Sequence, residues 1–518
     1  WTPTVSTINI DAQGASGSVL QAASSAKGIE LTVFENVVMG DGRYANNPFL
    51  QETPEPITKV CWDNVLLVSP KYGKEQGWEE KNVIEVKAGG YTVQLPVVFQ
   101  PGQAYGSCSI ALGYGRTKAG SEKCQVGKNA FPFASFNGET FDYVKSGVTL
   151  QKVGGQYEGV GGYGLARTQT HSTIDDERFI VGLASLESYK KDKFAGNHYS
   201  LEWDEKAKEG EFFTLYGEDP LFGPHADKFN RGPRWGMAID LSSCTGCGAC
   251  VPACHIENNV PVVGQEEVAR VHEMHWMRID RYYMGKDMEN PEVAFMPMMC
   301  QHCESAPCEN VCPVAATNHS GEGLNQMAYN RCIGTRYCAN NCPYKVRRFN
   351  WFDYQGSDSF YKDTIFDNDE WTTADELSRM VLNPDVTVRS RGVMEKCSMC
   401  VQRIQDGKLT AKRENRQLRD GEIKSACQAA CPANAIVFGD LNNPTSEVSK
   451  LHGNERNYYL LEELHVVPGI GYQTRIKNRE ALAGIDSYSG DGTAHESTEH
   501  GKTEEQHEAA PAENGHGG

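Results

Sequence analysis

The stretch CTGCGACVPAC, residues 244–254, decides the architecture of the second half of this chain. Its cysteines follow the spacing C-x2-C-x2-C-x3-C, and Gly246 and Gly248 stand between the first three. Glycine permits turns tight enough for one short loop to aim three thiols at a common point. The fourth thiol, Cys254, serves a second point, so the stretch predicts two neighbouring sites held by thiolates.

Three further cysteine groups repeat this pattern with variations. The second, CQHCESAPCENVCP (300–313), lengthens the middle spacing, and the fourth is split into CSMC (397–400) and CQAACP (427–432). The third, NRCIGTRYCANNCPY (330–344), carries Thr335 where the second cysteine belongs. Of the 18 cysteines in the chain, three lie outside the four groups: Cys61, Cys108 and Cys124.

The cysteine spacing selects iron–sulfur clusters over the other common uses of cysteine. Disulfide frameworks are typical of small secreted domains, whereas these groups lie inside a long chain. Zinc is the alternative for isolated C-x2-C pairs. Loops of three thiolates with an outlying fourth are instead typical of ferredoxins, in which the fourth cysteine binds the other cluster of a pair. Four groups therefore predict two pairs and four cluster positions.

Thr335 predicts that one of the four clusters differs from the others. Four complete groups would supply sixteen cysteines, and this chain supplies fifteen. Threonine is a poor iron ligand beside thiolates, because soft sulfur donors suit these clusters. A cubane that lacks one protein ligand tends to lack that iron. We therefore expect one [3Fe–4S] cluster at this loop and three [4Fe–4S] clusters elsewhere.

The bulk composition favours a folded chain without membrane spans. Hydrophobic residues make up 39% of the 518 residues, the mean hydropathy is −0.52, and no apolar run approaches the roughly 18 residues of a membrane helix. The net charge of −18 argues against nucleic-acid binding, which needs basic surface. The chain starts at Trp1 with no basic-then-apolar leader, so we expect any targeting signal to be missing from this form or already removed.

Composition divides the chain into five segments. Alternating or β-branched runs punctuated by Gly and Pro, such as NVIEVKAGG (82–90), predict a compact β-barrel or sandwich before residue 135. We expect an α+β protein with a β domain at 1–135, a joining region at 136–230, a cysteine-rich domain at 231–442, a docking extension at 443–485 and a flexible acidic tail at 486–518. The tail contains four histidines that could bind metal, but a solvated, disordered tail is the favoured interpretation.

The cysteine-rich domain also contains an internal repeat. WGMAIDLSSC (235–244) and QMAYNRC (326–332) each place a short apolar run before the first cysteine of a group. CPVAAT (312–317) and CPANAI (431–436) each place Cys-Pro before a turn of small residues. These segments look like copies of one small module.

This domain resembles the four-cluster ferredoxin subunits of the complex iron–sulfur molybdoenzyme family, such as those of polysulfide, dimethyl sulfoxide and nitrate reductases. CPYKVRRFNW (342–351) is similar to the signature that follows the third group in that family. In such subunits the first and fourth groups pair, and the second and third pair. The resemblance implies three [4Fe–4S] ligand sets and one [3Fe–4S] set: Cys244, Cys247, Cys250 and Cys431; Cys397, Cys400, Cys427 and Cys254; Cys300, Cys303, Cys308 and Cys342; and Cys332, Cys338 and Cys312, with Thr335 at the vacant position.

The β domain carries a second resemblance. LPVVFQPGQAYGSCSIALGYGRTKAG (95–120) and VGKNAFPF (126–133) look like the C-terminal β domain of molybdopterin-dinucleotide enzymes, in which such a loop can touch the pterin. Arg116 and Lys118 could hold a phosphate, but Gly-rich sequence of this kind also forms plain turns, and that interpretation is favoured. We expect a molybdopterin-enzyme-like barrel without its cofactor, followed by a double two-cluster ferredoxin-like domain.

The order of these two domains resembles the iron–sulfur subunit of alternative complex III, a bacterial quinol:electron-acceptor oxidoreductase. LARTQTHSTIDDERFIVGLASLESYKKD (165–192) resembles its joining region. The resemblance implies an electron-transfer subunit with no catalytic residue of its own, peripheral at the periplasmic face of the inner membrane. The implied partners are an integral membrane subunit of the polysulfide reductase type, which binds quinol beside the [3Fe–4S] cluster, and multihaem and monohaem cytochrome c subunits.

Two other functions are compatible with the residues. The chain is either wired to a true molybdenum site, as in polysulfide or dimethyl sulfoxide reductase, or it is a structural zinc scaffold. Near the loops, we expect three aromatic side chains to pack against the clusters: Tyr337, Tyr344 and Trp351. Three basic residues either offset cluster charge, dock a partner or form a solvated face: Lys345, Arg347 and Arg348.

Overall fold

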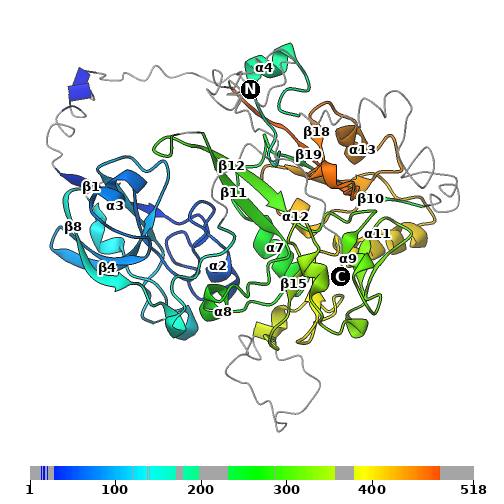
Figure 1. Cartoon of the computed structure of the whole chain (residues 1–518), viewed down its shortest axis with the longest axis horizontal. Coiled ribbons are helices and arrows are strands. Elements are labelled where there is room, and N and C mark those ends of the chain that lie inside the picture. Colours follow the sequence, from blue (N-terminus) through cyan, green and yellow to red (C-terminus); the bar gives the residue numbers. More distant parts are fainter. Residues whose placement is uncertain are drawn as a thin grey trace, which may run out of the picture.

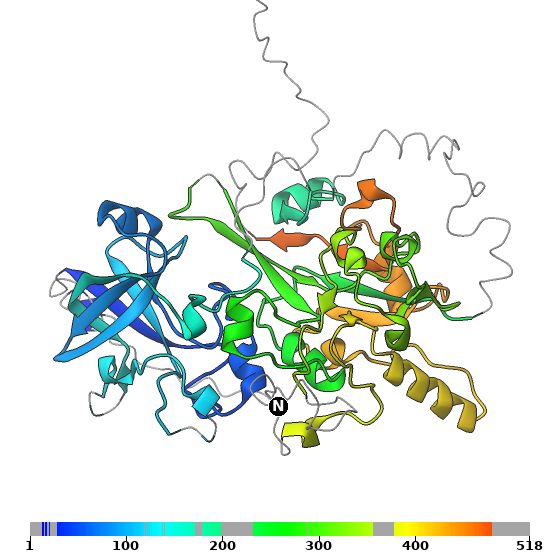
Figure 2. The same cartoon turned by 60° about the horizontal axis from the view of Figure 1, so that its bottom comes forward.

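The computed structural model describes residues 28–170, 179–197, 232–355 and 378–478, apart from 119, 121, 137, 139 and 286, together with 13, 14, 16, 17 and 20. The described chain is a mixed α+β protein with two bodies (Figure 1). A barrel built from the first part of the chain stands beside a cysteine-rich region of short strands and helices. The second view keeps the same two bodies side by side (Figure 2).

Six strands close the barrel in the order β1-β5-β2-β4-β3-β8. Every second side chain of a strand points into the barrel. Along β3, for example, apolar residues alternate with polar ones, and Ile84, Val86 and Ala88 are buried. The predicted β-barrel is therefore confirmed. The barrel strands are β1 (Ile29–Glu35), β2 (Leu66–Val68), β3 (Asn82–Ala88), β4 (Tyr91–Phe99), β5 (Ser107–Leu112) and β8 (Val144–Gln156).

One barrel strand lies outside the segment that the sequence predicted as β. Strand β8 falls in the expected joining region beyond residue 135. Most side chains of β8 are exposed, so its sequence lacks the alternation that marks a strand. Backbone pairing with both β1 and β3 holds β8 in place instead. The barrel thus extends past the expected boundary.

Short elements surround the barrel and link it to the second region. The helices and 3₁₀ turns are α2 (Pro48–Glu52), α3 (Pro70–Glu75), η1 (Glu122–Cys124), η2 (Phe131–Phe133), η3 (Val160–Gly162) and α4 (Leu186–Lys191). The strands are β6 (Ser135–Phe136), β7 (Phe141–Asp142) and β9 (Leu183–Ser185). Arg116 and Lys118 are exposed in the loop after β5.

The internal repeat of the cysteine groups appears as two strand pairs. Strand β10 (Trp235–Asp240), before the first group, pairs antiparallel with β17 (Ile436–Asp440), after the fourth. Strand β14 (Asn325–Met327), before the third group, pairs antiparallel with β13 (Thr317–His319), after the second. The first pairing brings together two cysteine groups that are distant in sequence, and the second is a hairpin between two consecutive groups.

Short helices carry or follow the cysteines. Helix α7 packs against α12, and α9 packs against α10, so the helices pair in the same way as the strands. The helices of this region are α7 (Cys250–Glu257), α8 (Gln265–Ala269), α9 (Pro307–Asn310), α10 (Tyr337–Asn340), α11 (Val401–Arg413), α12 (Ala426–Ala429) and α13 (Glu447–His452), with 3₁₀ turns η4 (Tyr329–Arg331), η5 (Ser378–Val381) and η6 (Glu462–Leu464).

The segment expected to be a docking extension is part of the same sheet as the first cysteine group. Strands β18 (Asn457–Tyr458) and β19 (Ile470–Gln473) complete the sheet β17-β10-β19-β18. The other strands of the region pair as β11 (Arg278–Met284) with β12 (Glu292–Met298), β15 (Arg348–Phe349) with β16 (Met394–Glu395), and β20 (Arg475–Lys477) with β9. The expected acidic tail at 486–518 lies outside the described residues.

Buried polar contacts fix the barrel against the cysteine-rich region around β11 and α8. The carboxylate of Glu52, at the end of α2, accepts the backbone N–H groups of Val263 and Gly264 at 2.9 and 2.8 Å. The Arg281 side chain donates to the Ile57 carbonyl at 2.9 Å. Such contacts are favourable in the interior because each buried donor finds an acceptor. Among the described residues, no helix has both the length and the apolar character needed to cross a bilayer.

Candidate metal centres

Four cysteines from the second and third groups line one internal cavity. The cavity lies beside Tyr344 and Arg347. Its thiols come from the loop after β12, from α9 and from the loop after α10, and all four are buried. The structure thus brings together the set expected for one [4Fe–4S] cluster: Cys300, Cys303, Cys308 and Cys342.

The remaining cysteines of these two groups line a second cavity of about 290 Å³ of empty space. Cys312, Cys332, Cys338 and Thr335 all contribute to its wall, and no other cysteine is among its lining residues. The wall next to Thr335 reaches the surface, where Ile333 is 65% exposed. The three cysteines expected to hold the [3Fe–4S] cluster therefore share one cavity with the threonine.

The first and fourth groups also come together. Burial raises the pKa of the Cys254 thiol well above its ordinary value, and the charges of Cys397, Cys400 and Cys427 raise it further. Burial likewise raises the pKa of Cys244, with Cys431 and Cys247 adding to the rise. For Cys250, burial is the largest cause of a raised pKa, followed by Cys427, Cys244, Cys247 and Cys431. These mutual influences show that the first and fourth groups lie close together; Cys427 acts on Cys250 across the two expected ligand sets, so the division into those sets stays a prediction.

Hydrogen bonds to sulfur accompany the clustering. A backbone N–H group points at each of five cysteine sulfurs, within 3.2 to 3.4 Å. These are Ala316 to Cys312, Met394 to Cys332, Met399 to Cys397, Ala426 to Cys400 and Ala435 to Cys431. The Asn258 amide approaches the sulfurs of both Cys254 and Cys400, at 3.5 and 3.8 Å. Such donors stabilise negative charge on cluster sulfur and thereby tune reduction potentials.

Burial raises the pKa of several thiols in these groups. Burial raises the pKa of Cys308 to about 11 and that of Cys400 to about 12. Cys312 is the exception: burial raises its pKa, but backbone N–H groups of Thr317, Val314 and Ala316 together lower it below the ordinary value. Metal ligation releases such protons and joins binding to folding. The donor set, thiols around enclosed cavities with N–H groups aimed at sulfur, fits iron–sulfur clusters.

Backbone conformation supports the loops where the sequence indicated glycine. Gly246 and Gly248 both adopt positive φ, 72° and 79°. A Cβ atom on Gly246 would lie 2.4 Å from the ring of Phe295, so only glycine fits that turn. The prediction of glycine-dependent turns in the first group is confirmed. Among the described residues, no group of three or more His, Cys, Asp or Glu side chains is arranged to hold a single metal ion.

The basic residues after the third group have three different environments. Lys345 is exposed and donates to the Asn340 carbonyl at 2.9 Å. Arg348 pairs with Glu273 at 3.2 Å. Arg347 is buried, and its Nη2 atom lies 3.1 Å from the Cys308 sulfur. The three basic residues therefore differ in the role that each can have. Of the three, only Arg347 contacts a cysteine that is expected to bind a cluster.

The aromatic side chains near the loops also differ. Tyr344 is buried in the wall of the Cys300–Cys342 cavity, and its hydroxyl donates to the Leu460 carbonyl at 2.9 Å. Tyr337 is 56% exposed. Trp351 is partly exposed and stacks on His272. Packing around a cluster cavity is thus observed for Tyr344 and not for Tyr337 or Trp351.

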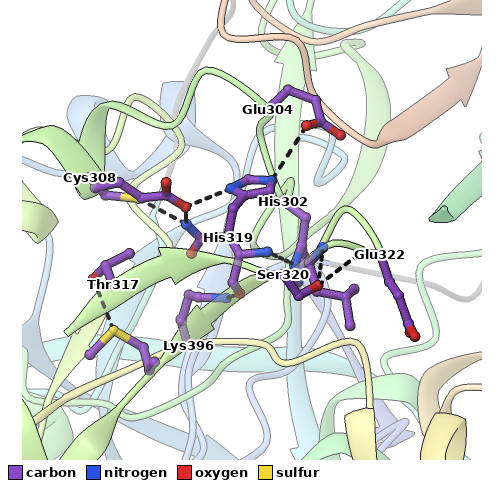
Figure 3. A network of polar contacts seen from close by, with 12 residues as sticks. His302, Glu304, Cys308, Thr317, His319, Ser320, Glu322 and Lys396 are labelled. Carbon is purple, nitrogen blue, oxygen red and sulfur yellow. Dashed lines mark hydrogen bonds and ion pairs between the residues drawn. The ribbon is translucent and has the colours of Figure 1, made fainter. Parts of the chain in front are cut away.

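Sequence reasoning missed a polar network around the same cavities (Figure 3). His319, on β13, lies 2.7 Å from Glu309, and the Asn325 amide approaches the Cys308 sulfur at 3.8 Å. Lys396, next to Cys397, is buried and donates to the Cys397 carbonyl at 2.8 Å. No motif marks these residues, because their role depends on where β13 and β14 place them. Burial of a lysine beside a cysteine group has no signature in sequence.

Comparison with known proteins assigns the cysteine-rich region. Two families described as "4Fe-4S dicluster domain" match residues 243–316 and 291–357. The iron–sulfur cluster-binding subunit of menaquinone reductase from Nitratidesulfovibrio vulgaris is 40% identical over 47% of this chain and 89% of that protein. A putative dimethyl sulfoxide reductase iron–sulfur subunit from Halobacterium salinarum is 35% identical over 46% of this chain and 78% of its own length.

Two further matches differ in how similar they are to this chain. The iron–sulfur subunit 1 of an Hdr-like menaquinol oxidoreductase from Archaeoglobus fulgidus is 34% identical, over 42% of this chain and 75% of that protein. Among solved structures, acetylene hydratase from Pelobacter acetylenicus matches with 16% identity and a TM-score of 0.20, over 26% of this chain and 20% of that chain. A likeness at that score has no bearing on fold or function. The iron–sulfur matches place the first three cysteine groups in 4Fe–4S dicluster domains, which removes the zinc scaffold.

Proposed function

Because this chain belongs to the family of 4Fe–4S dicluster iron–sulfur subunits of menaquinol- and dimethyl sulfoxide reductase-type respiratory oxidoreductases, we propose that it is the iron–sulfur subunit of an alternative complex III-type quinol:electron-acceptor oxidoreductase. In this proposal it relays electrons from quinol, oxidised in a membrane partner, towards cytochrome c haems. The relay consists of one [3Fe–4S] and three [4Fe–4S] clusters.

One observation supports the relay: the second and third cysteine groups line two neighbouring cavities, and the first and fourth groups lie close enough to influence one another's pKa values. The two cavities of the second and third groups are neighbours along the chain: Cys308 lies in the wall of one and Cys312 in the wall of the other. The Cys397 thiol, of the fourth group, is close enough to Cys300 for that charge to raise its pKa, after burial as the larger cause. Neighbouring clusters are what a chain of one-electron steps requires. Cluster type, hydrogen bonds and burial then set each potential.

Thr335 supports the assignment of the three-iron cluster. It occupies the ligand position of the third group and lines the cavity of Cys312, Cys332 and Cys338. The position is at the surface, and solvent exposure of a cluster is one of the factors that sets its potential. We place the entry of electrons from the quinol partner at this exposed cluster.

The names of the relatives support a place next to a quinone pool but differ in direction. One relative is a subunit of a menaquinone reductase and another of a menaquinol oxidoreductase. A chain of clusters conducts both ways, so the potentials of its partners decide the direction. We propose quinol oxidation, with a polysulfide reductase-type membrane subunit and multihaem and monohaem cytochrome c subunits as partners, and a peripheral position at the periplasmic face of the inner membrane.

The barrel distinguishes this proposal from a second one. We propose that it is a molybdopterin-enzyme-type β domain that holds no pterin. The alternative is a relay to a true molybdenum site, and the dimethyl sulfoxide reductase relative favours it. Metal analysis of the isolated complex separates the two. Iron without molybdenum supports the quinol:cytochrome assignment, whereas one molybdenum atom for each copy of this chain would establish the alternative.

Quinol-driven reduction tests the function itself. The complex is mixed anaerobically with a reduced menaquinol analogue, and cluster absorption and haem absorption are followed together. We expect the clusters to become reduced before or together with the haems, and added cytochrome c to reoxidise them. Clusters that stay oxidised while the haems are reduced would overturn the relay.

A further inference from the structure

Arg347 forms the partition between the two cavities of the second and third groups. Only 6% of the residue is exposed. Its Nη2 atom lies 3.1 Å from the Cys308 sulfur and 3.0 Å from the Asn325 side-chain oxygen. Its Nη1 atom donates to the Thr317 hydroxyl at 3.1 Å and lies 3.2 Å from the Met327 sulfur. Thr317 and Met327 are wall residues of the cavity that contains Thr335, so the guanidinium reaches both cavities.

The charge of Arg347 is felt by thiols of both cysteine sets. Burial raises the pKa of Cys308, and Arg347 is the largest influence that opposes this rise. Burial likewise raises the pKa of Cys338, in the other cavity, and Arg347 opposes that rise through its charge and a hydrogen bond. The influence is mutual: burial lowers the pKa of the guanidinium, but Cys308, Cys300 and Cys338 raise it above its ordinary value.

Arg347 differs from three other buried or half-buried arginines in this domain, Arg278, Arg348 and Arg389. Within the described part of the chain it forms no ion pair with a carboxylate. Three others each pair with one: Arg278 with Asp280, Arg348 with Glu273 and Arg389 with Glu395. A buried cation is costly unless an opposite charge compensates it. The compensating charge available to Arg347 is that of the thiolates on either side.

We propose that Arg347 is a fixed, shared counter-charge that raises the reduction potentials of the two adjacent clusters together. The inference rests on the proposed function in one respect, namely that the Cys312, Cys332 and Cys338 site holds the [3Fe–4S] cluster. Reduction of either cluster adds one electron and hence one negative charge. A buried guanidinium favours the more negative state, because charges interact strongly where water is excluded. Arginine suits this role because its guanidinium stays protonated at any physiological pH.

Two features of the loop make the role specific to this position. Lys345 carries the same charge three residues from Cys342, but water surrounds its side chain and screens it. The charge of Arg348 is compensated by Glu273. Arg347 is instead an uncompensated positive charge enclosed between the two cavities of the second and third groups. The shared guanidinium also couples the two sites. When one cluster is reduced, its added negative charge offsets part of the positive charge of Arg347, and the guanidinium then stabilises the reduced state of the other cluster less.

EPR-monitored redox titration of the assembled complex tests the proposal. The variant Arg347→Gln removes the charge, Arg347→Lys keeps it, and Lys345→Gln removes an exposed charge from the same loop. We expect Arg347→Gln to lower the midpoint potential of the three-iron signal and that of a neighbouring four-iron signal. At fixed solution potential near the midpoint, the ratio of reduced to oxidised three-iron cluster should fall about tenfold, which is about 59 mV for a one-electron couple.

The control variants decide between charge and structure. Arg347→Lys should keep both potentials near the wild-type values, and Lys345→Gln should leave them nearly unchanged. Equal downward shifts in Arg347→Gln and Arg347→Lys, or in Arg347→Gln and Lys345→Gln, would overturn the counter-charge role. If Arg347→Gln does not retain its iron, Arg347→Lys decides alone: wild-type potentials support the proposal and lowered ones overturn it. Absence of any three-iron signal in the wild type would instead refute the cluster assignment, so the two failures are distinguishable.

Discussion

The two cavities of the second and third cysteine groups are built from the same kinds of loops, yet they differ in their relation to solvent. The four cysteines of the first cavity, Cys300, Cys303, Cys308 and Cys342, are all buried. In the second cavity Cys312 and Cys332 are only partly buried, and Thr335 and Ile333 in its wall are exposed. The same fold thus produces one interior site and one surface site from a repeated pattern.

This difference suggests how two clusters of one relay can have different functions: their exposure to solvent differs, although the loops that hold them are alike. An enclosed cluster experiences nearby charges strongly, because little water screens them. A cluster at the surface is accessible to a partner, and its potential responds to solvent and to the partner itself. The missing cysteine is at the surface site, where a change of ligand disturbs the least packing. We infer that the interior site conducts and the surface site exchanges electrons with the partner.

Removal of one ligand from each site should produce the largest effect and the clearest contrast. Cys303→Ala should lose about four irons, and Cys312→Ala about three, as the ligation of each cluster requires. Cys303 belongs to the hydrophobic core, whereas Cys312 is half-buried, so Cys303→Ala should also lower the thermal unfolding midpoint more. Iron analysis and calorimetry on the same preparations check both statements. A greater loss of stability in Cys312→Ala would reverse the comparison.

Completion of the third group should make the two sites alike. Thr335→Cys restores the missing ligand, so we expect a gain of about one iron and loss of the three-iron EPR signal in the oxidised protein. Thr335→Ser serves as the control and should retain both the signal and the iron content. An unchanged three-iron signal in Thr335→Cys would show that this position is not the vacant ligand site.

Lys396 should affect the interior site and not the surface site. Its buried ammonium donates to the carbonyl oxygens of Asn325 and Cys397, without an ion pair in the described residues. Its charge opposes the burial-induced rise in the pKa of Cys308. Lys396→Met should therefore lower the midpoint potential of a four-iron cluster by about 59 mV, which corresponds to about a tenfold fall in the ratio of reduced to oxidised cluster. The midpoint potential of the three-iron cluster should not change.

The control for that variant is Lys396→Arg, which keeps a positive charge in the same place. It should preserve the four-iron potentials in the redox titration. A shift of the three-iron midpoint in Lys396→Met as large as that of the four-iron midpoint would remove the distinction between the two sites.

The smallest effect on the protein itself is expected at the open edge of the surface site. Ile333→Ser and Tyr337→Ser change exposed side chains, so each should alter the free energy of unfolding by less than about 0.5 kcal/mol. The cluster signals should remain. Because we propose that this edge faces the quinol partner, the rate of quinol-driven cluster reduction in the complex should fall. Matched substitution of another exposed residue, Leu409→Ser on α11, should not slow that rate.

Much of the site could be predicted because cysteine spacing is a local property. The groups themselves, the glycine turns and the vacancy at Thr335 are all read within short windows. The pairing of the groups is not local, and it followed only from resemblance; the ligand sets stay predictions that the observed cavities support. That a basic residue of the loop offsets cluster charge was only one of three interpretations of Lys345, Arg347 and Arg348. Burial decided it, and burial depends on how β13 and β14 pair.

The barrel shows the same limit. Strands β3 and β4 alternate clearly and were predicted, whereas β8 is held by backbone pairing along an exposed face and gave no pattern. The boundary of the barrel was therefore placed too early. The segment after residue 443 was likewise expected to be a separate extension. Its strands instead join the sheet of the cysteine-rich region: β19 pairs with β10, and Tyr458 and Tyr472 are buried there. Nothing in the local sequence indicates this pairing.

Low-temperature EPR of the air-oxidised protein, with iron counted in the same sample, tests the central claim most directly. The account predicts the isotropic signal of an oxidised three-iron cluster, with about 15 irons for each chain, from three four-iron clusters and one three-iron cluster. No such signal together with about 16 irons would mean that a ligand other than cysteine completes a fourth cubane at Thr335, and no signal with about 12 irons would mean that the surface site holds no cluster. Either result would contradict the division into an interior conductor and a three-iron surface site.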